Sequence, residues 1–124
     1  MKQILSIVLS ALLLILASCS GDRDLKNDAE NIAKAMCKNI ESMNKLKACD
    51  TADHTKVLHL QLDERQAEIE MTILYKEFKD KYKEKVSDKK FSEKFAKELR
   101  RAMLNCPYLS KEDRANFEKE LENK

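Results

Sequence analysis

Residues 25–46, LKNDAENIAKAMCKNIESMNKL, decide the fold of this chain. Apolar residues recur here every three or four positions, a spacing that places them on one face of an α-helix. The members of this stripe are Leu25, Ala29, Ile32, Met36, Ile40, Met43 and Leu46. The spacing predicts a first amphipathic helix over residues 24–48.

The residues that usually end helices are almost absent from the chain. The only glycine is Gly21 and the only proline is Pro107. Antiparallel sheets need turn residues roughly every 8–12 positions, so the long stretch between these two residues argues against strands. Lys, Glu, Leu, Ala and Met are abundant, and all of them favour helices. The composition therefore predicts a single all-α domain.

A second helix is predicted over residues 55–85, with an apolar face wide enough to contact two neighbours. Its apolar residues are Leu60, Leu62, Ala67, Ile69, Met71, Ile73, Leu74, Phe78 and Tyr82. We expect a third helix to begin after Ser87 as N-cap and to end before Pro107. The apolar residues of this third helix are Phe91, Phe95, Leu99, Ala102 and Met103.

The segment Ser110-Lys111-Glu112-Asp113 is similar to a capping box, with Asp in place of the preferred Glu or Gln. It predicts a short fourth helix that carries Ala115, Phe117 and Leu121. Short connections make neighbouring helices antiparallel. The expected fold is an antiparallel helical bundle of three long helices and a short C-terminal helix.

The N-terminal segment carries an export pattern. Lys2 is followed by an apolar run over residues 4–16 and then by Leu16-Ala17-Ser18-Cys19, as in secretory signal peptides. These four residues resemble the lipobox of bacterial lipoproteins. The resemblance implies cleavage before Cys19 and a diacylglycerol on its sulfur, with acylation of the new amino group. The alternatives are an ordinary signal peptide or an uncleaved anchor.

The lipobox divides the chain into three parts. Residues 1–18 are the expected signal peptide, residues 19–23 the lipidated cysteine with a short polar tether, and residues 24–124 the helical domain. Two or three acyl chains hold a protein stably on a bilayer. Within the family, Ser20 after the lipidated cysteine favours the outer membrane over the inner membrane. We therefore expect a membrane-anchored protein of the cell envelope.

Charge argues against nucleic acid as a partner. Loss of Lys2 with the signal peptide leaves 23 basic and 22 acidic side chains, whereas nucleic-acid binders need a one-sided basic surface. Residues 76–90 are rich in lysine, but acidic residues interleave with them. The sequence favours a solvated hairpin tip there, with anionic lipid headgroups or an acidic partner as the alternatives.

Three cysteines follow the lipobox, and an oxidising compartment favours one disulfide. Cys37 and Cys49 are twelve residues apart on one predicted helix, about 18 Å, whereas a disulfide needs Cα atoms within about 7 Å. Stacking the predicted helices by length places Cys106 near the height of Cys37. We predict a Cys37–Cys106 disulfide and a spare Cys49 thiol; the alternative is two buried free cysteines.

The same arrangement loosely resembles small uncharacterised helical lipoproteins in which an early helix and the end of a late helix are tied together. The matching stretches are Ala33-Lys34-Ala35-Met36-Cys37 and Ala102-Met103-Leu104-Asn105-Cys106. This resemblance implies the same link between Cys37 and Cys106. No known activity is associated with it.

Candidate chemistry is confined to one turn. Cys49, His54 and His59 are the only clustered residues of the types that bind Zn²⁺, but no CxxC, HxxxH or HExxH spacing is present. The other interpretation is a polar turn in which Asp53 or Thr55 caps the second helix. Cys49 could also act as a nucleophile with one of the same histidines as its base. The sequence offers no third group that would orient that histidine.

These observations predict no enzyme, and no cofactor beyond the covalent lipid on Cys19. They favour a protein-binding or accessory module whose partner is another envelope protein. One alternative is an inhibitor or immunity-type protein against an envelope enzyme, with residues 49–55 as the plugging loop. A second is a small metal or thiol-redox protein that uses Cys49, His54 and His59.

Overall fold

The computed structural model describes the backbone of residues 2–123 and the side chains of residues 21–123 other than Asp22. Its secondary structure is all-helical, with four helices and no strand in these residues: α1 (Lys2–Ala48), α2 (His54–Lys81), α3 (Lys89–Met103) and α4 (Lys111–Glu122). The predicted all-α class is confirmed. The expected signal peptide and Cys19 lie outside the residues whose side chains are described.

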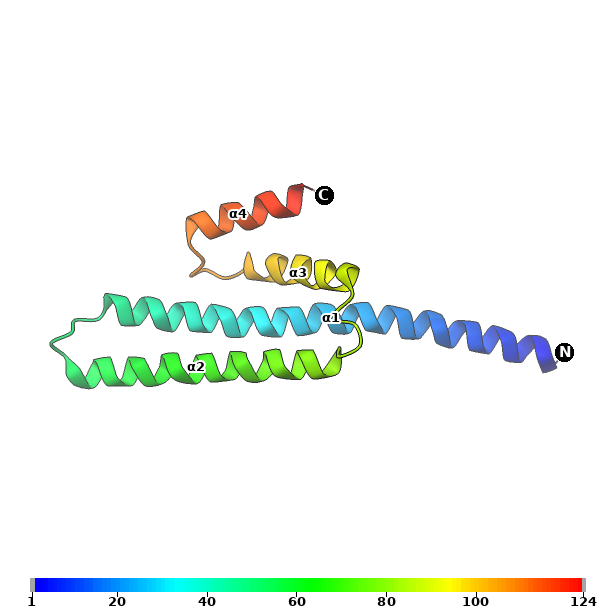
Figure 1. Ribbon diagram of the computed structural model, residues 1–124, viewed down its shortest axis with the longest axis horizontal. Helices are drawn as coiled ribbons and strands as arrows, with labels where there is room; N and C mark the ends of the chain where they lie inside the picture. Colours follow the sequence, from blue (N-terminus) through cyan, green and yellow to red (C-terminus); the bar gives the residue numbers. More distant parts are fainter. Residues whose placement is uncertain (1, 124) are drawn as a thin grey trace.

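The four helices lie side by side in the order α2, α1, α3, α4 (Figure 1). Helix α1 packs against both α2 and α3, and α4 packs against α3. Successive helices run in opposite directions (Figure 1). Within the described residues, no helix is both long and apolar enough to cross a bilayer.

Side-chain caps fix where the helices begin. The Asp53 side chain accepts a hydrogen bond from the backbone N–H of Lys56 at 3.1 Å, which confirms one of the two predicted caps of the second helix. Ser110 accepts from the backbone N–H of Asp113 at 3.0 Å, as the capping pattern predicts. The Ser110 hydroxyl also donates to the Asp113 carboxylate at 2.7 Å.

Two helix boundaries at the connection between α2 and α3 differ from the prediction. Helix α2 ends at Lys81 rather than at residue 85, and a series of turns occupies residues 82–87. Tyr82 is buried against Phe78 and Phe91, so the chain reverses immediately after it. The cap of α3 is Asp88, not Ser87, because the Asp88 carboxylate accepts from the backbone N–H of Lys90 at 2.8 Å.

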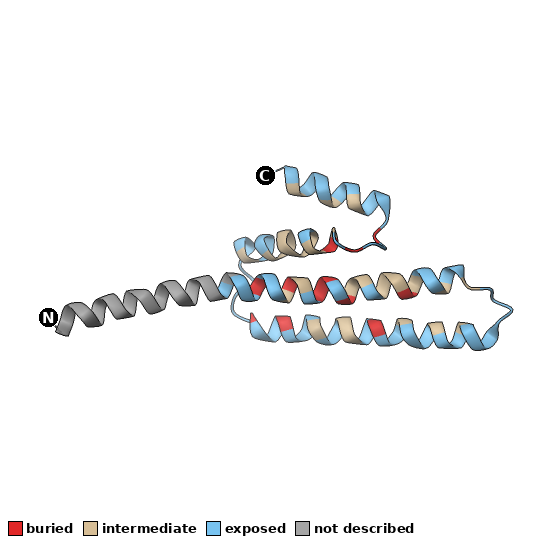
Figure 2. Ribbon diagram, turned by 180° about the vertical axis from the view of Figure 1, so that it is seen from behind, coloured by how far each residue is buried: buried red, intermediate tan, exposed pale blue. Residues whose placement is uncertain are grey.

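The core consists of two groups of buried side chains (Figure 2). The first joins α1 to α2 and α3 through Leu25, Ile32, Phe78 and Tyr82. The second joins α1 to the end of α3 and the following turn through Ala33, Met103, Cys106 and Leu109. Helix α4 has no buried residue and contributes the partly buried Phe117 to this second group.

A disulfide between Cys37 and Cys106 lies in the second group. The two Cα atoms are 5.6 Å apart, and 69 positions separate the residues in sequence. The predicted pairing is therefore confirmed, and Cys49 is the free, half-buried cysteine among the described residues. Residues 21–23, part of the tether expected over residues 19–23, are helical and belong to α1.

The wide apolar face predicted for the second helix is only half covered. Leu62, Ile69 and Ile73 are 64%, 53% and 51% exposed, so the expectation that they pack against a second neighbour is wrong. Helix α3 packs against α1 and meets α2 on its core side, where the rings of Phe91 and Phe95 stack on Phe78. One face of α2 therefore has no covering helix within the described chain.

Candidate functional site

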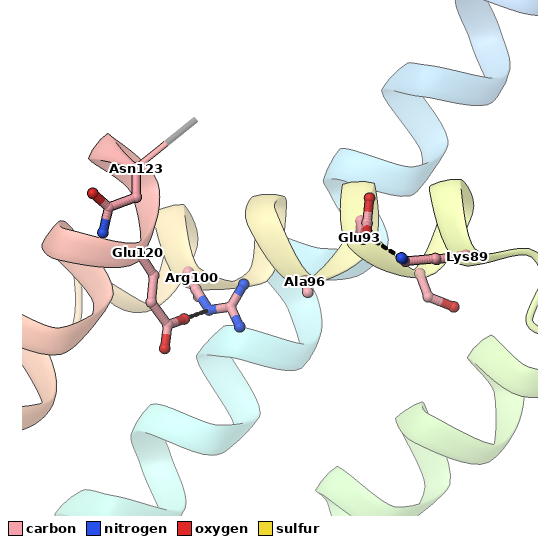
Figure 3. A pocket seen from close by; sticks show the side chains of 7 residues that line it. Lys89, Glu93, Ala96, Arg100, Glu120 and Asn123 are labelled. Carbon is pink, nitrogen blue, oxygen red and sulfur yellow. Dashed lines mark ion pairs between the residues drawn. The ribbon is translucent and has the colours of Figure 1, made fainter.

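A hollow of about 530 Å³ lies between α3 and α4 (Figure 3). Its charged side chains pair with one another: Lys89 with Glu93 along α3, and Arg100 of α3 with Glu120 of α4. Arg114 adds a second tie between the helices, since its guanidinium donates to the carbonyls of Leu104 and Cys106. The charged groups of the hollow are therefore engaged in an ion pair within α3 and in the attachment of α4.

The metal or thiol site that was the second alternative is not assembled in the described residues. Within residues 21–123, no three His, Cys, Asp or Glu side chains are grouped so that they could hold a metal ion. His54 and His59 are exposed on the first turns of α2, while the Cys49 thiol contacts the backbone carbonyl of Asp50 at 3.6 Å.

The acidic residues of this turn have structural roles. Asp50 accepts from the backbone N–H of Ala52 at 3.0 Å, and Asp53 caps α2. The interpretation of residues 49–54 as a polar turn accounts for these contacts.

One polar cluster ties α1 to the end of α2. Lys81 Nζ lies 2.7 Å from an oxygen of the Asp28 carboxylate, and the Tyr82 hydroxyl donates to the same oxygen at 2.7 Å. Burial raises the pKa of Tyr82 to about 12, and the hydrogen bond to Asp28 acts in the same direction. The cluster therefore holds Tyr82 in its neutral form. It also fixes the start of the connection between α2 and α3.

We expect one of the three tyrosines to ionise only near pH 12. Because the pKa of Tyr82 is higher in the folded chain than the ordinary value of about 10, its contribution to stability is complete below about pH 10. That contribution is lost as the pH rises through about 12. Near-ultraviolet titration of tyrosinate checks this. Tyr82→Phe should remove the late phase, and a wild-type titration without such a phase would contradict the assignment.

The most unusual surface is the uncovered face of α2. Leu58, Leu62, Ile69 and Ile73 are all more than half exposed, and their spacing of four, seven and four residues places them along one side of the helix. We call these four residues the α2 stripe. Arg65 lies on the same side and forms no ion pair or hydrogen bond to the rest of the described chain.

Sequence reasoning placed most of this stripe in the core. The available signal was the width of the apolar pattern: the second helix has apolar residues on two opposite sides, whereas an ordinary surface helix has one apolar face. Exposed apolar patches on soluble proteins mark interaction surfaces when they are contiguous. The stripe is therefore the strongest candidate functional surface in the described chain.

Comparison with known proteins yields no assignment. No family model, curated protein or solved structure matches the chain.

Proposed function

We propose that the chain is a lipoprotein, anchored through Cys19 to a membrane of the bacterial cell envelope, whose helical domain binds another envelope protein. The lipobox pattern of residues 16–19 supports the anchor, and Ser20 favours an outer-membrane location. The single observation that carries the binding role is the α2 stripe, because four large apolar side chains lie in water along one helix.

The stripe suits a helical partner. Its apolar residues lie at the helix-in-groove spacing through which amphipathic helices recognise each other, and from Leu58 to Ile73 they extend about 22 Å at ~1.5 Å per residue. Arg65 lies between Leu62 and Ile69 without an acidic neighbour paired to it. A complementary partner helix therefore has two pairs of apolar residues with an acidic residue between them.

The packing of α2 against α1 supports this role by holding the stripe in place. Helix α2 is joined to α1 along its length, and an ion pair between Lys38 and Glu70 at 3.0 Å links the two helices on one side. Ala67 is fully buried at the contact with α1. A rigid helix loses little entropy when a partner docks.

Photo-crosslinking in cells tests the proposal. A photoreactive residue in place of exposed Gln66, which lies beside the stripe, should give one discrete product with one envelope protein. Leu62→Glu should abolish that product, because a buried charge at the centre of an interface costs about 2 kcal/mol or more, roughly 30-fold in affinity. Folding should be unchanged, since Leu62 is 64% exposed.

A matched variant separates the stripe from a general effect of charge. Ala115→Glu introduces the same side chain at an exposed position on α4 and should leave the product unchanged. A photoreactive residue at Asn116, also on α4, should give no equivalent product. Crosslinks only between copies of this chain, or equal products from positions 66 and 116, would contradict the proposal.

A further inference from the structure

The turn between α2 and α3, together with the helix ends that flank it, carries an excess of basic residues. Residues 79–90, which we call the basic turn, contain six lysines and three acidic residues, a net charge of +3. The rest of the chain after the lipobox is net acidic, at −2. This end of the domain therefore carries a net positive charge.

The structure determines how much of this charge is available. Residues 83–90 are all exposed. Lys83 and Lys85 have no ion pair with any described residue, whereas Lys81 is paired with Asp28 and Lys89 with Glu93. On the acidic side, Asp88 is engaged as the cap of α3, which leaves Asp80 and Glu84 as the acidic residues of the turn without a structural partner.

The basic turn lies beside the point where the domain joins its predicted anchor. Gly21 and Asp24 of α1 line one hollow together with Lys81, Lys83 and Lys85, and the α2–α3 connection passes next to α1 at this end (Figure 1). Gly21 follows Cys19 by two residues, at most about 7 Å along an extended chain. A lipid on Cys19 therefore brings the end of the domain that carries the basic turn close to the bilayer surface.

We infer that the basic turn contacts anionic lipid headgroups and stands the domain end-on against the membrane. The inference rests on the proposed lipid anchor at Cys19. Lys83 and Lys85 supply the attraction to the headgroups, and the exposed Val86 beside them enters the interface. Helix α2 has 28 residues, about 42 Å, so the α1–α2 turn and the α2 stripe extend away from the bilayer toward a partner.

Tryptophan quenching measures this orientation, because the chain has no tryptophan of its own. The full-length chain, processed and lipidated in cells, is reconstituted with Val86→Trp or, as the matched control at the opposite end, with Ala52→Trp. The vesicles contain phosphatidylcholine and phosphatidylglycerol brominated near the headgroups. The indole introduced at position 86 should be quenched strongly, and the indole introduced at position 52 should not.

Charge variants test the role of the lysines. Lys83→Gln with Lys85→Gln should lower the ratio of membrane-contacting to detached orientations by roughly 30-fold, since each lysine near an anionic surface contributes about a fivefold factor. Quenching at position 86 should then fall to its level in vesicles of phosphatidylcholine alone. Lys111→Gln with Lys119→Gln, which removes the same charge from α4, should leave the quenching unchanged.

The outcomes separate this inference from the proposed anchor. Mass spectrometry of Cys19 and flotation with vesicles report the anchor directly, and an unmodified chain that does not float overturns both proposals. A lipidated chain that floats but shows equal quenching at positions 86 and 52, or quenching at position 86 that is insensitive to the lysines, overturns the basic-turn contact alone.

Discussion

Replacing Cys37 and Cys106 with serine should lower the free energy of unfolding by about 4 kcal/mol. The disulfide closes a loop whose ends are 69 positions apart, and in the chain-entropy model this constraint on the unfolded chain contributes that amount. Small domains are stable by only about 5–15 kcal/mol in total. Denaturation with urea, followed by circular dichroism, should show a much lower midpoint for the double variant.

The third cysteine provides the control. Cys49→Ser removes a half-buried thiol outside the disulfide, so its unfolding midpoint should stay close to that of the wild type. A reductant should destabilise the wild type and the Cys49→Ser variant to the level of the double variant. Equal stability of the wild type and the double variant would show that packing of Met103 and Leu109 alone holds the end of α3 against α1.

The disulfide could be predicted because it depends on helix lengths. Rise per residue and short connections determine which cysteines reach the same height, and this places Cys37 and Cys106 together. The caps at Asp53 and Ser110 were predictable for a similar reason, since a local side chain accepts from a backbone N–H three residues on. All of these predictions concern geometry within a helix or between helices joined by short turns.

What the sequence did not reveal is which faces of a helix are covered. The periodicity of α2 indicates apolar residues on two sides, but it does not say whether a neighbour exists for each side. Helix α3 packs against α1 and against the core side of α2 at Phe78, which leaves Leu62 and Ile69 exposed. The closeness of the basic turn to Gly21 was also missed, because it depends on where α2 ends relative to α1.

The change of Phe78 to alanine should destabilise the domain by about 3–5 kcal/mol, the usual cost of removing a buried phenylalanine. Phe78 is 6% exposed, and its ring centroid lies 4.1 Å from that of Phe95 and 4.8 Å from that of Tyr82. Because the ring of Phe78 stacks on rings of α3, the truncation weakens the link between these two helices as well as removing apolar area. Urea denaturation gives the size of the loss.

Tyr75→Ala is the matched control, since it removes an aromatic ring three residues earlier on the same helix. Tyr75 is 47% exposed, and its ring contact is with Lys79 at 4.9 Å, so the loss should stay below about 1 kcal/mol. Phe78→Leu should recover much of the stability lost in Phe78→Ala by refilling part of the cavity. Similar losses for Tyr75→Ala and Phe78→Ala would mean that helix propensity, rather than the aromatic contact between α2 and α3, determines the effect.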